Sequence, residues 1–431
     1  MRRREFAGAL AAPLLAQPIS AQQRPRPNIV FVLVDDLRWD ALGATGLAWA
    51  RTPNIDRLAR EGMSFRNAFV TTPLCSPARA SFLTGQYARK HGVVGNTPAG
   101  EPISHKLVTF PKLLHDAGYE TAYVGKWHMG TDDSPRPGFD RWVSFKGQGV
   151  YENPPLNIDG KQVEKSGYMT DILSDYAAEF LEARHEKPFC LYVSHKAVHG
   201  PFTPAPRHKD LFAGDVPPPR PTRSGPQDRH LEIARNQMRC MVSIDEGVGR
   251  MYAALEKSGQ LDNTIFVFTS DNGYFWGEHG FGDKRWAYDE SLRIPLIVRY
   301  PALVPRGSRS SALALNVDIA PTALHLAGVE VPKGMHGRSL KEPLRGNLRT
   351  WRTSFLAEYF KEERFPNTPT WQAVRSARHK YVRYPNGERP DELFDLVKDP
   401  YERTNLATSG AAKPFLDRMK LDLEAKLRQT A

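Results

Sequence analysis

The sequence predicts an α/β fold in which a large, mostly parallel sheet is flanked by helices, with a smaller C-terminal α+β domain. Three continuous apolar runs, at 29–34, 189–193 and 264–269, have the pattern of strands that are buried on both faces of a parallel sheet. Helical patterns such as those at 171–183 and 232–255 separate these strands along the chain. This alternation favours a sandwich with helices on both faces of the sheet.

Length and composition narrow the class of protein. The chain has 431 residues, of which 40% are hydrophobic and 25% charged, and this excludes disorder as the main state. No apolar run reaches the ~18 residues that a membrane-spanning helix needs. Three cysteines are too few for a disulfide scaffold or a four-cysteine zinc site. The net charge of +11 favours an anionic partner, but no basic block indicates nucleic-acid binding.

The amino terminus has the pattern of an export signal. A positively charged start is followed by a short apolar run and by small residues that end near Ala21. This pattern predicts a cleaved signal over residues 1–21, so that the mature protein would be periplasmic or secreted. The pair Arg3-Arg4 favours a twin-arginine signal, and an ordinary Sec signal is the alternative.

Polar residues follow each of the three predicted buried strands. They are Asp35 and Asp36 after the first strand, His195 and His199 after the second, and Asp271 and Asn272 after the third. Ligands bind outside the carboxyl ends of strands in open α/β sheets, so we expect these side chains to meet there. The four oxygen-bearing side chains suit Ca²⁺ or Mg²⁺ better than zinc. The two histidines lack the His-Glu-x-x-His pattern, and we interpret them as anion or substrate contacts.

The segment from Cys75 to Gly85 predicts a helix whose N-terminus carries a cysteine. Pro77 suits the first helical turn, where its missing N–H has no cost. Cys75 would then lie at a helix N-terminus, which is a ready anion site, and Arg79 can offer a planar fork to an oxyanion. The other two cysteines, Cys190 and Cys240, lie in a strand and a helical pattern and are interpreted as small core residues.

Two segments resemble signature motifs of the sulfatases of the alkaline-phosphatase superfamily. They are Cys-Ser-Pro-Ala-Arg with the following Ala-Ser-Phe-Leu-Thr-Gly at 75–85, and Gly-Tyr-Glu-Thr-Ala-Tyr-Val-Gly-Lys-Trp-His at 118–128. Further family segments occur in order: Asp35-Asp36, the Ser-His-x-x-x-His of 194–199, Asp271-Asn272-Gly273, Gly277-Glu278-His279-Gly280 leading to Lys284, and Asp399-Pro400-x-Glu402. The resemblance runs from about Asn28 to the carboxyl end and implies an alkaline-phosphatase-like sandwich. Ala78 stands where the family often has serine.

The resemblance implies a particular chemistry at Cys75. In the family, a formylglycine-generating enzyme oxidises this cysteine to Cα-formylglycine. The aldehyde hydrate carries two hydroxyl groups, of which one attacks the sulfate while the other later loses its proton to expel it. The resemblance also implies a bound Ca²⁺, which polarises the sulfate oxygens.

Carried over by motif position, the resemblance assigns two groups of residues. The expected Ca²⁺ ligands are Asp35, Asp36, Asp271, Asn272 and the residue made from Cys75. The residues expected around the sulfate are Arg79, Lys126, His128, His199 and Lys284. Among these, His128 would act as the base that helps to expel sulfate, and His199 or Lys284 would protonate or stabilise the leaving oxygen. His195 matches less securely and is interpreted as a core histidine with its hydrogen bonds satisfied.

The chain pattern changes after about residue 340. Residues 371–375 and 380–384 alternate like antiparallel strands, a turn signal follows at 385–387, and an amphipathic helix covers about 412–427. We therefore predict a catalytic domain over 27–340 and a small α+β domain over 341–431.

The expected function is the hydrolysis of a sulfate ester, on a substrate that is expected to be a sulfated glycan. The segment from His195 to Phe202 looks most similar to exported carbohydrate sulfatases, including N-acetylglucosamine-6-sulfatases. Two alternatives remain open: a phosphodiesterase or phosphonate monoester hydrolase of the same superfamily, and a non-catalytic, metal-stabilised glycan-binding protein. Loops at 147–165, 206–229 and 359–371 are candidate specificity surfaces.

Overall fold

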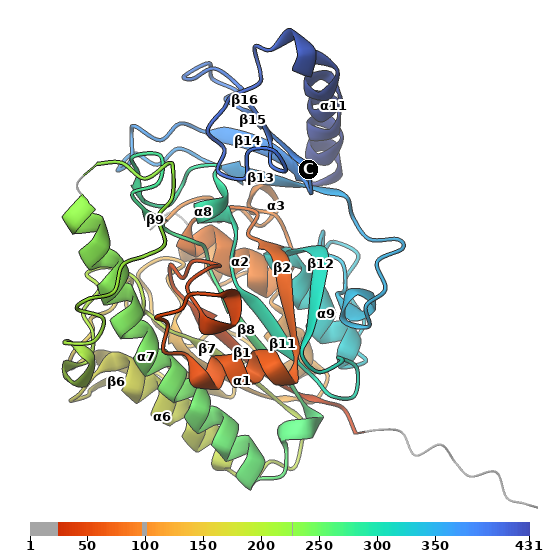
Figure 1. The fold of residues 1–431 in the computed structure, drawn as a ribbon. Helices are drawn as coiled ribbons and strands as arrows, with labels where there is room; N and C mark the ends of the chain where they lie inside the picture. The colour runs from red at the N-terminus through yellow and green to blue at the C-terminus, as the bar shows by residue number, and fades with distance from the viewer. Residues whose placement is uncertain (1–24, 97–100, 226) are drawn as a thin grey trace, which may run out of the picture.

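The structure is a computed structural model of the chain, which describes residues 25–96, 101–225 and 227–431. The predicted export signal at 1–21 lies outside these residues. Among the described residues, no helix is both long and apolar enough to cross a membrane. The two kinds of sheet that the sequence predicts are both present (Figure 1).

A ten-stranded sheet forms the centre of the molecule, in the order β12-β2-β11-β8-β1-β7-β3-β4-β5-β6. Its strands are β1 (Asn28–Val34), β2 (Met63–Phe69), β3 (Glu120–Lys126), β4 (Arg141–Phe145), β5 (Pro155–Ile158), β6 (Lys161–Glu164), β7 (Phe189–Ser194), β8 (Thr264–Ser270), β11 (Leu296–Arg299) and β12 (Ser308–Leu315). The middle strands β8, β1, β7, β3 and β4 are parallel, whereas β11 and β5 pair antiparallel with their neighbours. The predicted large, mostly parallel sheet is confirmed.

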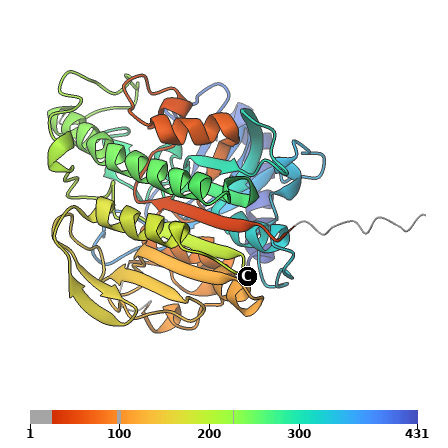
Figure 2. The same cartoon turned by 90° about the horizontal axis from the view of Figure 1, so that it is seen from below.

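Strand β1 shows why this sheet is buried on both faces. Its odd-numbered residues from Ile29 to Leu33 belong to one apolar core, and its even-numbered residues from Val30 to Val34 belong to another. The first core includes residues of α2 (Cys75–Thr84), α5 (Phe110–Asp116) and α9 (Ile319–Leu326). The second includes residues of α1 (Pro53–Glu61), α6 (Met169–Glu182) and α7 (Gln227–Lys257), which lie side by side on one face in Figure 2.

A separate four-stranded antiparallel sheet follows in the chain, in the order β13-β14-β15-β16. Its strands are β13 (Ser354–Tyr359), β14 (Trp371–Ser376), β15 (His379–Arg383) and β16 (Glu392–Asp395), and α11 (Lys413–Gln429) packs on it. Apolar residues of this sheet, such as Phe355 and Trp371, continue the α2 core. The predicted alternating strands and the final amphipathic helix are both confirmed.

The remaining elements are short. They are the helices α3 (Ala88–His91), α4 (Glu101–Ser104), α8 (Asp289–Leu292) and α10 (Lys341–Leu344), and the paired strands β9 (Phe275–Trp276) and β10 (Gly282–Asp283). The β9–β10 pair immediately precedes Lys284. Cys190 in β7 and Cys240 in α7 are buried free thiols, as expected for core residues.

Candidate active site

The carboxyl ends of four parallel strands bring the predicted residues together. Strand β1 pairs with β8 up to Val34 opposite Ser270, and β7 pairs with both β1 and β3 up to Ser194. Asp35-Asp36 and Asp271-Asn272 therefore follow neighbouring strands at one edge of the sheet. Lys126 is the last residue of β3 and reaches the same edge. The expectation that these strand ends meet is confirmed.

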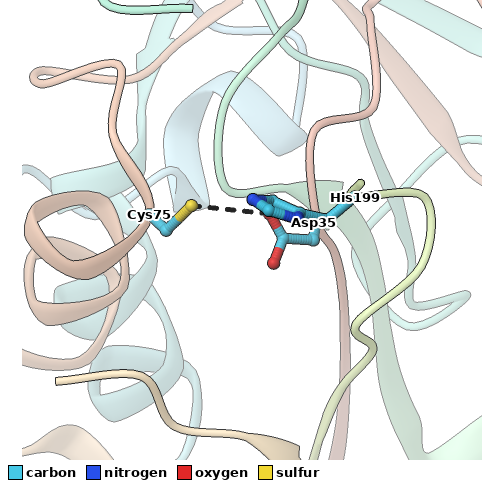
Figure 3. Close-up of side chains that lie close together, drawn as sticks. All are labelled: Asp35, Cys75 and His199. Carbon is cyan, nitrogen blue, oxygen red and sulfur yellow. Dashed lines mark hydrogen bonds between the residues drawn. The ribbon is translucent and has the colours of Figure 1, made fainter. Parts of the chain in front are cut away.

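Cys75 is the first residue of α2, with Leu74 as the N-cap. The helix starts where the sequence predicts it, and Pro77 lies in its first turn. The Cys75 thiol is fully buried and lies 3.5 Å from Oδ1 of Asp35, to which it donates (Figure 3). Burial, and next the Asp35 carboxylate, raise the pKa of the thiol to about 12. The unmodified thiol is thus neutral and a weak nucleophile.

Arg79 binds the carboxylates at the strand ends. Its Nε donates to Oδ2 of Asp271 at 3.0 Å, and its Nη2 donates to Oδ2 of Asp35 at 3.1 Å. Its Nη1 donates to the carbonyl oxygen of Lys126 at 2.8 Å. Arg79 is 1% exposed, and all three nitrogens of its guanidinium donate hydrogen bonds to these groups.

The acidic residues form a cluster that fits a hard divalent cation. Carboxylate oxygens of Asp35, Asp36 and Asp271 all lie within 4.8 Å of one another. Burial, and next the Asp35 carboxylate, raise the pKa of Asp271 to about 7. Nδ2 of Asn272 donates to Oδ1 of Asp36 at 2.6 Å, while the buried Oδ1 of Asn272 has no hydrogen-bond partner in the described structure. Crowded carboxylates beside an unpartnered amide oxygen are the donor set that Ca²⁺ prefers.

Two buried lysines contact these carboxylates directly. Nζ of Lys126 donates to Asp35 and, at 2.6 Å, to Oε1 of Gln148. Nζ of Lys284 lies 2.5 Å from Oδ1 of Asp36. Burial opposes the charge of Lys284, but Asp36 outweighs it and holds the pKa of the lysine well above its usual range. The structure therefore places two fixed positive charges beside the acidic cluster.

The two predicted histidines lie in the same region. Burial and Lys126 hold the pKa of His128 well below its usual range, and its buried Nδ1 has no partner among the described residues. Nδ1 of His199 donates to the carbonyl oxygen of Gly200 at 3.0 Å, and its Nε2 lies 3.8 Å from Oδ2 of Asp36. Burial, and next Lys284, lower the pKa of His199 to about 4. Figure 3 shows the His199 ring beside Asp35 and Cys75.

Backbone strain marks two of these residues. Asp36 and His128 have φ values of 62° and 55°, in the left-handed region that is unfavourable for residues other than glycine. Such conformations persist where the surrounding structure imposes them, and they cluster at functional sites.

A pocket of about 580 Å³ opens beside the cluster. The pocket is lined by four of the predicted site residues, which are Asp36, His128, His199 and Lys284. The other lining residues were not assigned to the site individually from the sequence: Asn96, Gln148, Gly200, Phe202, Tyr274, Asp283, Arg285, Glu362, Arg364 and Phe365. Two of the three candidate specificity loops contribute lining residues, at Gln148 and at 362–365, whereas the loop at 206–229 contributes none to the described pocket. Another hollow, of about 380 Å³ around Arg66 and Arg293, contains none of the predicted residues. The pocket that holds the predicted residues is thus also the larger of the two.

His195 differs from its interpretation as a core histidine with satisfied hydrogen bonds. The side chain is fully buried, but both ring nitrogens lack a hydrogen-bond partner in the described parts of the chain. Its electrostatic neighbours are Arg250 on α7 and Asp171 on α6, so it faces the helices rather than the pocket. The spacing of residues could place His195 in the core but could not show what surrounds it.

Comparison with known proteins identifies the family to which this arrangement belongs. A family model described as Sulfatase matches residues 27–329, and one described as N-sulphoglucosamine sulphohydrolase, C-terminal, matches residues 277–429. The chain therefore belongs to the sulfatase family and is a sulfuric ester hydrolase. The fold is that of the alkaline-phosphatase-like sulfatases.

Named relatives extend over most of the chain. The N-acetylglucosamine-6-O-sulfatase of Bacteroides thetaiotaomicron is 33% identical, in an alignment that covers 92% of this chain and 85% of the relative. The N-acetylglucosamine-6-sulfatase of Homo sapiens is also 33% identical and covers 89% and 81% of the two chains.

Solved structures share the fold. A protein solved in complex with its substrate D-glucosamine-2-N,6-O-disulfate has a TM-score of 0.87 and 32% identity, covering 94% of this chain and 98% of that one. The phosphonate monoester hydrolase of Agrobacterium radiobacter has a TM-score of 0.79 at 22% identity, over 94% and 96% of the two chains. The second likeness shows the shared fold alone.

Proposed function

We propose that this sulfatase removes sulfate from a sulfated glycan, with a 6-sulfated glucosamine or N-acetylglucosamine residue as the first candidate. The observation that carries the proposal is the meeting of Asp35, Asp36, Asp271 and Asn272 beside Cys75, next to a pocket that Asp36 lines. The glycan assignment is supported by the relatives that are named for 6-sulfated glucosamine substrates.

The proposed reaction needs two groups that the sequence implies. Asp35, Asp36, Asp271, Asn272 and residue 75 would hold Ca²⁺, whose charge polarises the sulfate oxygens. Formylglycine at position 75, made by a formylglycine-generating enzyme, supplies as its hydrate one hydroxyl for attack and a second whose deprotonation releases sulfate. The neutral, buried thiol of Cys75 supports the need for this modification, because an unmodified thiol here would be a poor nucleophile.

The basic side chains around the cluster would position the carboxylates and stabilise negative charge. Arg79 keeps Asp35 and Asp271 in place, since its fork is already used by them. Lys126 and Lys284 supply fixed positive charge for a substrate whose charge shifts in the transition state.

Proton transfer falls to two of the pocket residues. His128 lines the pocket with a neutral ring and an unpartnered Nδ1, which suits the base that takes a proton when sulfate is expelled. Lys284 lies in the pocket as an ammonium and would donate to, or stabilise, the leaving alcohol oxygen, with His199 beside it.

The proposal includes the cellular setting and the division of the chain. Residues 1–21 would direct export, and the enzyme would act in the periplasm or outside the cell. Sequencing of the mature amino terminus tests the export signal. A catalytic domain over 27–340 would be followed by a small domain over 341–431. The two separate sheets support this division.

Mass spectrometry and a substrate panel test the proposal together. The protein is produced with a formylglycine-generating enzyme, and the peptide that contains Cys75 is expected to show the mass of formylglycine. The panel holds 6-sulfated N-acetylglucosamine, other sulfated sugars, phenyl sulfate, a phosphate diester and a phosphonate monoester, with Cys75→Ala as the inactive control. We expect sulfate release from a sugar to dominate.

Each contrary result would support a different function for this chain. A dominant rate on the phosphate diester or phosphonate would replace the sulfatase assignment for this chain. Hydrolysis of phenyl sulfate without desulfation of any sugar would remove the glycan assignment alone. Unmodified Cys75 in protein from its own host, with no hydrolysis at all, would favour a binding protein.

A further inference from the structure

Part of the pocket wall comes from the segment between β13 and β14. Glu362 anchors this segment: its carboxylate accepts from Nε of Arg285 at 2.8 Å, from the hydroxyl of Tyr359 at 3.1 Å and from the backbone N–H of Asn96 at 3.1 Å. Glu362 is only 7% exposed. A buried carboxylate with partners from two other chain segments, and a third partner at the end of β13, holds this wall in one place.

The next residues continue the wall. The backbone N–H of Phe365 donates to the carbonyl oxygen of Glu362 at 3.0 Å. The guanidinium of Arg285 lies 3.4 Å from the centre of the Phe365 ring, a cation–π contact. Phe365 nonetheless remains 37% exposed and lines the pocket. The segment therefore offers an exposed aromatic surface on a fixed support, which suits the apolar face of a sugar ring.

Two arginines line this wall, and only one of them is neutralised. Arg285 pairs with both Asp283 and Glu362. Arg364 also lines the pocket, but it is exposed and has no ion pair or hydrogen bond with any described side chain. Its neighbour Glu363 is exposed as well and does not line the pocket. Arg364 is thus an unpaired positive charge at the pocket wall.

The lysines of the site cluster are already paired with carboxylates. Lys126 pairs with Asp35, and Lys284 pairs with Asp36, beside the place where the proposed function puts the sulfate to be cleaved. Arg364 belongs to another chain segment and forms no ion pair with these described residues. A planar guanidinium with free donors binds sulfate and carboxylate groups with two parallel hydrogen bonds.

We propose that Arg364 binds a second anionic group of the substrate, separate from the sulfate that is removed. This inference rests on the proposed function, because it takes a sulfated sugar as the occupant of the pocket. The second group would be an N-sulfate on the same sugar or the carboxylate of a neighbouring uronic acid. The substrate class is therefore a sugar sulfate with at least two negative charges, and Phe365 packs against its ring.

The test compares substrates with and without a second negative charge. For Arg364→Gln and the unchanged enzyme, kcat/KM is measured on 6-sulfated glucosamine with an N-sulfate, on the same sugar with a neutral N-acetyl group, and on a disaccharide with a uronic acid. The ratio of the doubly charged to the singly charged substrate should fall about three- to tenfold in Arg364→Gln, mainly through KM, as for a partly exposed charge pair. Comparison of the N-sulfated sugar with the uronic acid disaccharide shows which of the two anionic groups Arg364 binds.

Two further variants separate recognition from general charge effects. Glu363→Gln changes the charge of the adjacent exposed residue and should leave the ratio unchanged. Arg364→Lys keeps the charge and should restore part of the preference. An equal loss on both substrates, or an unchanged ratio, would overturn the proposal.

An aryl pair keeps this test apart from the proposed function. Phenyl sulfate is compared with a sulfated hydroxybenzoate, which carries a carboxylate in addition. If no sugar is desulfated but the aryl pair is hydrolysed, the glycan assignment fails, and the ratio on the aryl pair still decides whether Arg364 recognises a second anion.

Discussion

Two clusters of buried charge in this molecule combine acidic side chains with arginine and lysine, but one lies beside the pocket and the other lies between the two sheets. The site cluster consists of Asp35, Asp36 and Asp271 with Arg79, Lys126 and Lys284. The sheet–sheet cluster consists of Asp289 at the start of α8, Arg375 on β14, Lys380 on β15 and Glu402 in the C-terminal segment. It joins the part of the chain that carries the active site to the small sheet.

Asp271 and Asp289 show the difference most clearly. Burial, and next the carboxylate of Asp35, raise the pKa of Asp271 to about 7. Burial also opposes the charge of Asp289, but Arg375 and Lys380 outweigh it and hold its pKa well below its usual range. Nη2 of Arg375 lies 2.8 Å from Oδ2 of Asp289, and Nζ of Lys380 lies 3.0 Å from its Oδ1. The charge of Asp271 is thus disfavoured by a neighbouring carboxylate where a cation is expected, whereas the charge of Asp289 is favoured by two neighbouring cations where the two sheets meet.

The largest effect should come from breaking the site cluster at Asp271. Asp271→Asn keeps the shape of the side chain but removes one charged oxygen donor for the cation. We expect kcat/KM on phenyl sulfate to fall roughly 10²- to 10³-fold, because the cation supplies several kcal/mol of charge stabilisation. The free energy of unfolding without Ca²⁺ should not fall, because the substitution relieves the repulsion from Asp35.

Calcium titration checks this interpretation. Added Ca²⁺ should raise the melting temperature of the unchanged protein and raise that of Asp271→Asn much less. Equal stabilisation of both proteins by Ca²⁺ would show that Asp271 is not a ligand.

The matching substitution in the sheet–sheet cluster should act on stability instead. Asp289→Asn leaves Arg375 without its carboxylate and Lys380 with Glu402 alone, so the free energy of unfolding should fall by about 3 kcal/mol, as for a broken buried ion pair. At temperatures where the variant is folded, kcat/KM should stay within about twofold, well short of the several kcal/mol that a lost cation would cost. Urea unfolding and initial rates measure the two quantities.

A surface pair provides the control for this second substitution. Lys413→Gln breaks the exposed pair between Lys413 and Asp417 and should change stability by less than about 1 kcal/mol. A larger loss of activity than of stability in Asp289→Asn would break the comparison between the two clusters.

The two clusters also differ in how far the sequence could predict them. Strands that are buried on both faces are visible as continuous apolar runs, and parallel strands must end at one edge, so the meeting of Asp35 with Asp271 follows from local patterns. The partners of Arg79 do not follow, because a sequence shows which donors exist but not which acceptors fill them. In the sheet–sheet cluster, Glu402 belongs to a segment that resembles the sulfatase ending, yet only the structure shows that it binds Lys380.

The pocket wall was the hardest part to predict. Gln148, Asn96 and Arg364 lie in irregular segments without periodicity, and they meet the site through contacts between distant parts of the chain. The basic and aromatic composition of 359–371 indicated the right loop, but the distinction between the paired Arg285 and the unpaired Arg364 depends on contacts that no local pattern records.

The last prediction concerns His195, whose substitution should have the smallest effect on activity. This residue shares burial and unpartnered ring nitrogen with the site histidine His128, but not its position. His195 faces α6 and α7. Burial, and next Arg250, lower its pKa from 6.5 to about 4. The folded protein therefore keeps this ring neutral where the unfolded chain binds a proton, so stability should fall as the pH drops from 6.5 to 4.

Replacing the ring by an apolar side chain of similar size should remove this sensitivity. His195→Leu should lose the part of the pH dependence that His195 contributes, up to roughly 3 kcal/mol at pH 4 for a shift of this size. At pH 7.5 the variant should be at least as stable as the unchanged protein, because two buried polar atoms without partners are removed. Urea unfolding at pH 7.5 and pH 5 measures both effects, and kcat/KM at pH 7.5 should persist. An unchanged pH dependence would show that burial does not lower the pKa of His195, and a loss of activity as large as that of Asp271→Asn would place His195 with the site rather than with the core.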